Sequence, residues 1–235
     1  MIRHIQDKAM PYYAKISRLS ICISLLLSCS AICAAQEKKK LAFAILIDNT
    51  GSMRLQFELV KGIGKGVVHQ VYDHGPVSLF SFESEGIGRD SRAVPTSRIE
   101  QTQDEQLLDR TIDNAYVEGG PTTLLDAIEL MAERLRKQPE TDGVIILITD
   151  GEDRISEATR KEVIRRLKER NISIYAFGLV KHLDDHEGLS RRSDRSKAVD
   201  LLNSLTKETG GRVVFPKSGA SDVQSLIHQL ALPIQ

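Results

Sequence analysis

The chain has 235 residues, of which 41% are hydrophobic and 27% charged, and its basic and acidic residues balance to a formal net charge of zero. This is the composition of a globular protein long enough to bury a core without disulfides, and the zero net charge gives no indication of electrostatic nucleic-acid binding. Only 5% of the residues are aromatic and none is Trp, which argues against surfaces that stack on bases or sugars, so any functional site should be polar and local.

Residues 1–35 have the pattern of a secretory signal peptide. Four basic residues and one acidic residue precede Leu19–Ala35, an uncharged run that ends in small residues. Cleavage after Ala35 makes Gln36 the first mature residue. The main alternative is a retained membrane anchor, although the 17 residues of this run are at the short end for a spanning helix.

The cysteines also favour export. Cys22, Cys29 and Cys33 all lie in this segment, so a chain cleaved after Ala35 has neither a disulfide nor a thiol nucleophile. The tetrapeptide that ends at Cys29 (LLSC) loosely resembles a bacterial lipobox, which makes lipidation at Cys29 a further alternative. We therefore predict an extracytoplasmic protein, periplasmic or secreted, whose attachment to a membrane stays open.

Residues 36–235 are predicted to form one α/β domain. Leu41–Ile47 is a continuous apolar run, typical of a central strand covered by helices on both faces. Apolar residues from Leu55 to Val71 then recur at helical spacing and stop before Gly75-Pro76. Further elements are predicted as a strand at Val77–Phe82, a weak strand near Arg92–Val94, a helix at 104–115, a helix at 124–135 with Thr123 and Asp126 at capping-box spacing, a strand at Val144–Thr149, a helix from Ser156 to about Arg170, a strand at Ile172–Gly178, a helix at 194–209, a strand at Arg212–Phe215 and a helix at 220–232.

This alternation predicts a doubly wound, mostly parallel central sheet flanked by helices, which is a Rossmann-like architecture. One irregular stretch, Lys181–Ser193, follows the fifth strand. His182 and His186 stand four residues apart in it and could bind a transition metal on a helix, but the lack of apolar periodicity favours a solvated loop. Its position after a strand places it near the rim of a site at the strand ends, where it could affect the choice of partner.

Two carboxylates directly follow apolar strands. Asp48 begins the segment Asp-Asn-Thr-Gly-Ser after the first strand, and Asp150 follows Val144–Thr149. In a doubly wound sheet, ligands bind at the carboxyl ends of the strands near the switch in strand order. An uncompensated charge there is costly, and carboxylate and hydroxyl oxygens suit Mg²⁺, Mn²⁺ or Ca²⁺ better than Zn²⁺.

Three motifs in this order resemble the von Willebrand factor type A (VWA) family. Asp48-x-Thr50-x-Ser52 is similar to its DxSxS signature, Gly119–Ile128 (GGPTTLLDAI) to its glycine–threonine loop, and Ile148–Gly151 (ITDG) to its second-aspartate motif. Each motif alone is weak, but together they span about residues 41–232. Thr50 departs from the usual Ser and retains the hydroxyl.

The resemblance implies a metal-ion-dependent adhesion site. It assigns metal ligands to Asp48, Thr50, Ser52, Thr122 and Asp150, bound directly or through water, with Thr123 as the alternative to Thr122 one register step away. An ion with few bound carboxylates is electron-poor, and a Glu or Asp of a partner protein could complete its shell. The resemblance therefore implies an exported, metal-dependent protein-binding module for adhesion or scaffolding, and not an enzyme.

Two other functions remain open at this stage. A metal-dependent phosphohydrolase could use Asp48 as its nucleophile, since aspartyl-phosphate enzymes place an Asp after the first strand. Such enzymes have a second carboxylate two residues later, where this chain has Thr50. The third hypothesis is a scaffold in which the metal is purely structural.

Two features have simpler interpretations. Asp153 is predicted to be an exposed turn residue. Gly62, Gly64 and Gly66 lie within a helical pattern rather than after a strand, so they favour close helix packing over a nucleotide-binding loop.

Overall fold

A computed structural model describes residues 40–85, 92–120, 122–137, 141–183, 193–217 and 222–234, without the side chains of 83–85 and 92–98. The predicted signal peptide or anchor, residues 1–35, lies outside the described residues, as do His186 and most of the predicted loop at 181–193. Within the described ranges, no helix has both the length and the apolar character needed to cross a membrane.

The centre of the domain is a six-stranded sheet in the order β3-β2-β1-β4-β5-β6. Neighbouring strands are parallel except β2 and β3, which confirms the prediction of a mostly parallel sheet. The chain winds from β1 outward to β3 and then returns to β4 on the other side of β1, so the switch in strand order falls between β1 and β4. The strands are β1 (Lys40–Asp48), β2 (Val77–Glu85), β3 (Arg92–Thr102), β4 (Thr141–Thr149), β5 (Ile172–Gly178) and β6 (Val213–Val214).

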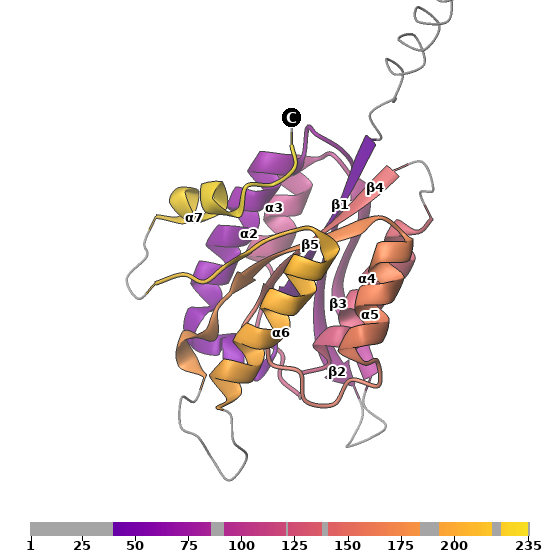
Figure 1. The fold of residues 1–235 in the computed structure, drawn as a ribbon. Helices are drawn as coiled ribbons and strands as arrows, with labels where there is room; N and C mark the ends of the chain where they lie inside the picture. Colours follow the sequence, from indigo (N-terminus) through magenta and orange to yellow (C-terminus); the bar gives the residue numbers. More distant parts are fainter. Residues whose placement is uncertain are drawn as a thin grey trace, which may run out of the picture. The chain divides into compact units, whose positions relative to one another are not determined.

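Helices cover both faces of this sheet (Figure 1). One face packs against α2 (Phe57–Val71), α3 (Glu105–Asp113) and α7 (Val223–Leu230). The other packs against α4 (Leu124–Leu135), α5 (Arg160–Glu169) and α6 (Asp194–Thr209). Two short 3₁₀ helices, η1 (Gly51–Gln56) and η3 (Val180–His182), follow β1 and β5.

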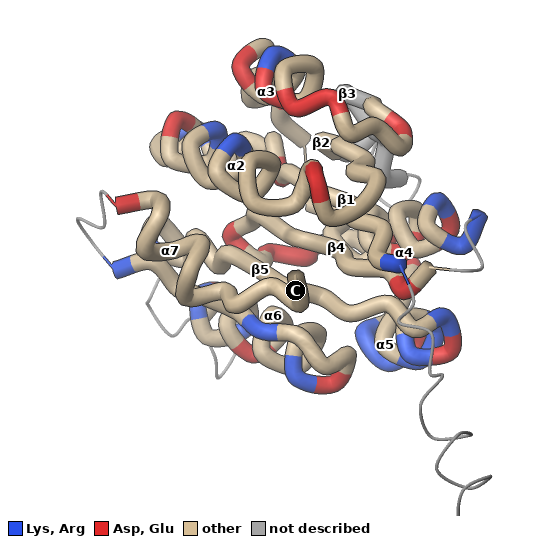
Figure 2. Tube along the Cα trace, turned by 90° about the horizontal axis from the view of Figure 1, so that it is seen from above, with Lys and Arg blue, Asp and Glu red and all other residues tan. Residues whose placement is uncertain are grey.

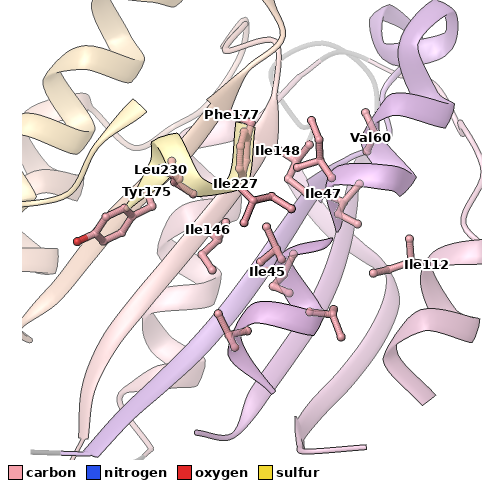
Figure 3. Close-up of a cluster of buried hydrophobic side chains, with 14 of the residues drawn as sticks. Ile45, Ile47, Val60, Ile112, Ile146, Ile148, Tyr175, Phe177, Ile227 and Leu230 are labelled. Atoms are coloured by element: carbon pink, nitrogen blue, oxygen red, sulfur yellow. The ribbon is translucent and has the colours of Figure 1, made fainter. Parts of the chain in front are cut away.

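The apolar run of β1 supplies both halves of the core. Ile45 and Ile47 pack toward α2 and α7, among the residues in Figure 3, and Ala44 and Leu46 pack toward α4 and α5. All four are at most 2% exposed. Because burial of each large aliphatic side chain contributes about 1.5–3 kcal/mol, the covering of both faces fixes β1 at the centre of the sheet.

Three predicted elements have the wrong boundaries. The weak strand near Arg92–Val94 is the antiparallel edge strand β3, which runs to Thr102. The helix expected from Leu55 begins as η1, which leaves the Leu55 side chain 79% exposed, and becomes α-helical only at Phe57.

The start of α5 is also wrong. This basic helix (Figure 2) begins at Arg160 with a capping box between Thr159 and Glu162, and not at Ser156. The Ser156 hydroxyl is used elsewhere, because it accepts a hydrogen bond from the Asp126 backbone N–H at the start of α4, 3.3 Å away.

The glycines of α2 confirm the prediction of close helix packing. A Cβ on Gly66 would stand 2.1 Å from Ile227 Cδ1 in α7, and one on Gly64 would stand 3.3 Å from Ile112 Cδ1 in α3. A Cβ on Gly62 would make an ordinary 3.5 Å contact with Val223. The approach of α7 to α2 therefore depends on Gly66 far more than on Gly62.

This difference predicts opposite responses to one substitution. Gly62→Ala should raise the free energy of unfolding by up to about 1 kcal/mol, because alanine favours the helix. Gly66→Ala gains the same propensity but forces the buried Ile227 out of its position, which costs about 1–3 kcal/mol. Urea denaturation of both variants measures the difference, and equal stabilisation of the two would contradict the packing.

Candidate metal site

The two predicted carboxylates end adjacent central strands. Asp48 is the last residue of β1, and Asp150 directly follows β4. The strands are parallel with Ile47 opposite Ile148, so both carboxylates lie at the carboxyl edge of the sheet, at the switch between β1 and β4. Both are buried, at 0% and 1% exposure.

The loop after β1 gathers three of the predicted ligands. Asp48 Oδ1 accepts hydrogen bonds from the Thr50 backbone N–H at 3.1 Å and from the Thr50 hydroxyl at 2.7 Å. Thr50 Oγ1 lies 3.3 Å from Ser52 Oγ. Asp48 and Thr50 are buried whereas Ser52 is exposed, so this row of oxygens leads from the sheet edge to the surface.

The end of β4 completes the polar cluster. The Thr149 hydroxyl donates to Asp48 Oδ2 at 2.7 Å and accepts from the Gly151 backbone N–H at 3.0 Å. Asp150 Oδ1 accepts from the Glu152 N–H at 2.9 Å. Asp150 Oδ2 is buried and has no hydrogen-bond partner among the described residues. A buried carboxylate oxygen left in this way is costly, so it fits a position that a cation would compensate.

Thr122 comes to the same edge through the loop before α4. Its carbonyl accepts hydrogen bonds from the N–H groups of Arg154 at 2.9 Å and Ile155 at 3.4 Å, which ties it to the loop after β4. Its side chain is only 2% exposed, and within the described part of the chain its hydroxyl joins none of the hydrogen bonds above. The structure brings Thr122 beside the Asp150 loop.

The start of α4 corrects two predictions. Thr123 is the N-cap residue, but its side chain makes no capping hydrogen bond, so the capping box with Asp126 is wrong. Asp126 instead accepts from the Ala158 N–H at 2.9 Å. Asp153 is not an exposed turn residue: it is partly buried, accepts from the Leu125 N–H at 3.3 Å, and so caps α4 from the neighbouring loop.

Burial raises the pKa of both carboxyls. Removal from water and the charge of Asp150 raise the pKa of Asp48 from 3.8 to about 7, against the hydrogen bonds from Thr149 and Thr50 that lower it. Desolvation likewise raises the pKa of Asp150, which the Ser52 hydroxyl and the Glu152 N–H partly offset. Without a cation, this pair resists carrying two negative charges.

Among the described residues, no basic side chain forms an ion pair with Asp48 or Asp150. Arg154 is the cation nearest in sequence, but its guanidinium is 61% exposed and bonded to Glu152, 2.9 Å away. Within the described ranges, no group of three or more His, Cys, Asp or Glu side chains comes together in a metal-binding arrangement. His182 is an exposed residue of η3. Two carboxylates with hydroxyl groups form a donor set suited to a hard cation such as Mg²⁺.

Sequence reasoning missed three residues of this edge. Thr149 bonds both to Asp48 and to the Asp150 loop, and its place opposite the end of β1 in a parallel pair was the available signal. Glu152 is 9% exposed, and its charge raises the pKa of Asp150. The Asn49 carbonyl accepts from the Glu118 N–H at 2.9 Å, which joins the loop after α3 to the site. Neither of the last two had a pattern that singled it out.

Fold and site together define an α/β domain with a polar cluster at the switch point of its sheet. The family model for the von Willebrand factor type A domain matches residues 43–229, which is most of the chain, and the chain belongs to this family. A search of curated proteins finds no match. A VWA domain fits a protein-interaction module, which agrees with the broad function predicted from the sequence.

Solved structures share the fold at low sequence identity. The conserved hypothetical protein BatB from Bacteroides thetaiotaomicron has a TM-score of 0.58 and 19% identity, over 81% of this chain and 98% of that one. A von Willebrand factor type A protein from Catenulispora acidiphila has a TM-score of 0.60 and 17% identity, over 82% and 42%. The pilus adhesin SpaC from Lactobacillus rhamnosus GG has a TM-score of 0.61 and 14% identity, over 83% and 30%, so this chain spans under a third of that adhesin.

The raised pKa of Asp48 predicts how pH affects the metal-free protein. Between pH 3.8 and about pH 7, the Asp48 carboxyl is protonated in the folded state and ionised in the unfolded state. The stability that this proton contributes is therefore lost as the pH rises through that window. Asp48→Asn keeps a neutral side chain and should avoid the loss. In EDTA its free energy of unfolding should exceed that of the wild type increasingly toward pH 8, by up to about 4 kcal/mol.

Urea denaturation at pH 5 and pH 8 measures this difference. Glu157→Gln, at an exposed position whose carboxylate forms no ion pair with another described residue, controls for the change of net charge. Parallel pH dependences of the wild type and Asp48→Asn would show that the carboxyl is already ionised at pH 5.

Proposed function

We propose that this chain is an exported protein-binding module that engages an acidic side chain of a partner protein through a divalent metal ion. The ion is Mg²⁺, with Mn²⁺ or Ca²⁺ as alternatives, and its ligands are Asp48, Thr50, Ser52, Thr122 and Asp150 in a metal-ion-dependent adhesion site. The observation that carries the proposal is the buried pair Asp48 and Asp150, of which Asp150 Oδ2 has no hydrogen-bond partner in the described residues.

The donor set favours binding over catalysis. Two carboxylates only neutralise a divalent cation and do not fill its coordination shell, so a carboxylate from outside can add a charge-assisted ligand at an open position. Both Asp48 oxygens already accept hydrogen bonds, from Thr50 and Thr149, which lowers their nucleophilicity. The metal would attract the partner's carboxylate, and the chain's own residues would hold the metal near the surface beside Ser52.

The surface around the site supports contact with a protein. Leu55 and Tyr116 are large apolar side chains that are 79% and 65% exposed. Leu55 lies in η1 with Ser52, and the Tyr116 carbonyl accepts from Asn49 Nδ2 at 3.4 Å. Single exposed apolar residues are common, but two that flank one polar cluster resemble the anchors of an interface.

The proposed extracytoplasmic location of the protein rests on the N-terminal segment. Residues 1–35 have the pattern of a signal peptide or anchor. Among the structural neighbours, one from Bacteroides fragilis is an aerotolerance-related membrane protein, with 18% identity and a TM-score of 0.60, and SpaC is a pilus adhesin. Both neighbours agree with an extracytoplasmic, periplasmic or secreted location for this chain.

Loss of one carboxylate should abolish metal and partner binding together. We expect Asp48→Ala and Asp150→Ala to lose Mg²⁺ binding in calorimetry and to lose EDTA-sensitive partners in a pull-down from envelope extract. Mg²⁺ at 100 times its dissociation constant should stabilise the wild type by about 2.7 kcal/mol and leave both variants unchanged. Asp73→Ala, an exposed position with the same change of charge, should behave as the wild type.

The same variants distinguish a metal that acts in partner recognition from the purely structural metal of the scaffold hypothesis. If Asp150→Ala loses partner binding while the fold stays intact, the metal acts in recognition. If thermal stability and binding fall together, the metal is structural. Partner capture that EDTA does not affect would contradict the proposal.

A phosphatase assay tests the alternative enzyme. We expect no turnover of generic phosphate esters with Mg²⁺, because the position two residues after Asp48 holds Thr50 and supplies no carboxylate for acid or base catalysis. Measurable hydrolysis that disappears in Asp48→Ala would overturn the ranking of the two functions.

A further inference from the structure

A groove of about 340 Å³ lies beside the candidate metal site. Its walls are η1 with the start of α2, and the residues that follow β5 and β6. Its apolar lining includes Leu55, Leu59 and Leu179, and its basic lining consists of Arg54, Lys181 and Lys217. The three basic residues are exposed, so the groove presents positive charge around an apolar floor. We call it the basic groove.

The basic groove is connected to the site by two hydrogen bonds of the Leu179 main chain. The Leu179 N–H donates to the Thr149 carbonyl at 2.8 Å, and Gln56 Nε2 donates to the Leu179 carbonyl at 2.8 Å. Ser52 and Leu55 belong to the same 3₁₀ helix, in which three residues span about 6 Å along the axis. An extended peptide covers that length with about two residues. One partner segment can therefore reach both the metal and the groove.

The cations of the basic groove are not neutralised within the described chain. Arg54, Lys181 and Lys217 form no ion pair with another described residue, and the acidic residue of the lining, Glu58, is 92% exposed and 3.7 Å from Lys61. The depression on the other side of Asp150 differs. There Arg154, Arg160 and Lys197 are matched by Glu152, Asp153 and Asp194.

The ion pairs of that second depression are explicit. Arg154 bonds to Glu152 at 2.9 Å, and Lys197 bonds to Asp194 at 2.9 Å. Among the described residues, the surface next to the site therefore carries unpaired basic side chains toward η1 and a balance of charges toward α5 and α6. An acidic segment that leaves the metal is attracted toward the basic groove and not toward the second depression.

We infer that the basic groove binds the continuation of the partner segment, and that this segment carries an apolar side chain about two residues from the metal-bound carboxylate, followed by further Asp or Glu residues. The inference rests on the proposed function for its first contact. The apolar side chain packs on Leu55 and Leu179, and the additional carboxylates pair with Lys181 and Lys217. The fold thus selects partners that are acidic beyond a single Glu or Asp.

Synthetic peptides test the inference directly. The probe is a fluorescein-labelled nonapeptide, Asp-Asp-Leu-Gly-Glu-Gly-Leu-Asp-Asp, whose symmetry serves both chain directions, with the full chain in Mg²⁺ and low salt. Replacement of its four Asp by Asn should weaken binding roughly tenfold, since an exposed ion pair contributes up to about a factor of five. The double variant K181E/K217E should weaken binding of the Asp peptide similarly and leave the affinity for Mg²⁺ unchanged.

Two further variants separate the groove from general charge effects. Arg160→Glu changes one charge in the second depression and should alter affinity by less than about twofold per charge. Leu55→Ser, at a position 79% exposed, should weaken binding while the protein stays folded. Anisotropy titrations give the affinities, and circular dichroism checks the fold.

The outcomes distinguish this inference from the proposed function. The inference about the basic groove is overturned by any of three results. These are equal affinity for the Asp and Asn peptides, a loss in Arg160→Glu equal to that in K181E/K217E, and no peptide binding to the wild type at millimolar concentration. If binding stays EDTA-sensitive while K181E/K217E has no effect, the metal site stands and the groove fails. If K181E/K217E removes binding that EDTA leaves unchanged, the groove stands and the metal contact fails.

Discussion

The arrangement of this domain depends on two buried carboxylates at the ends of adjacent central strands. Burial raises the pKa of both Asp48 and Asp150, and the charge of Asp150 raises the pKa of Asp48 further. Burying such a pair without compensation costs free energy in any fold. The same register that pairs β1 with β4 brings them together, so the charge conflict is a consequence of strand order and cannot relax without disturbing the sheet.

The loops around the pair are fixed by hydrogen bonds of backbone groups and short polar side chains rather than by long side chains. Thr149 joins Asp48 to the turn at Gly151, and the Thr122 carbonyl holds the loop after β4. Asp153 and Asp126 then cap and connect the segments that flank α4. Short polar side chains anchored in this way lose little freedom when a ligand arrives, so the cluster is preorganised for binding.

Sequence reasoning reached the parts that local pattern determines. The runs that precede Asp48 and Asp150 are apolar on both faces, which suffices to predict central strands and a polar strand edge. It failed where tertiary contacts compete with local ones. Ser156 was expected to cap its own helix, but its hydroxyl accepts a hydrogen bond from the start of α4 instead. The Asp153 carboxylate also accepts a hydrogen bond from the start of α4. The edge strand β3 was underestimated because its residues lack the apolar run of a buried strand.

The proposed function separates two kinds of specificity. A cation held by the carboxylates and hydroxyls at the strand ends would recognise a carboxylate, and any exposed Glu or Asp carries one. Discrimination among acidic partners has to come from surfaces that differ around the site, because a shared contact contributes equally to every partner. Among the described residues, the surface toward η1 is basic and apolar, while the charges toward α5 and α6 are balanced. The asymmetry lies in loop residues, outside the strand order that creates the site, so partner choice can change without altering the core that holds Asp48 and Asp150 in place.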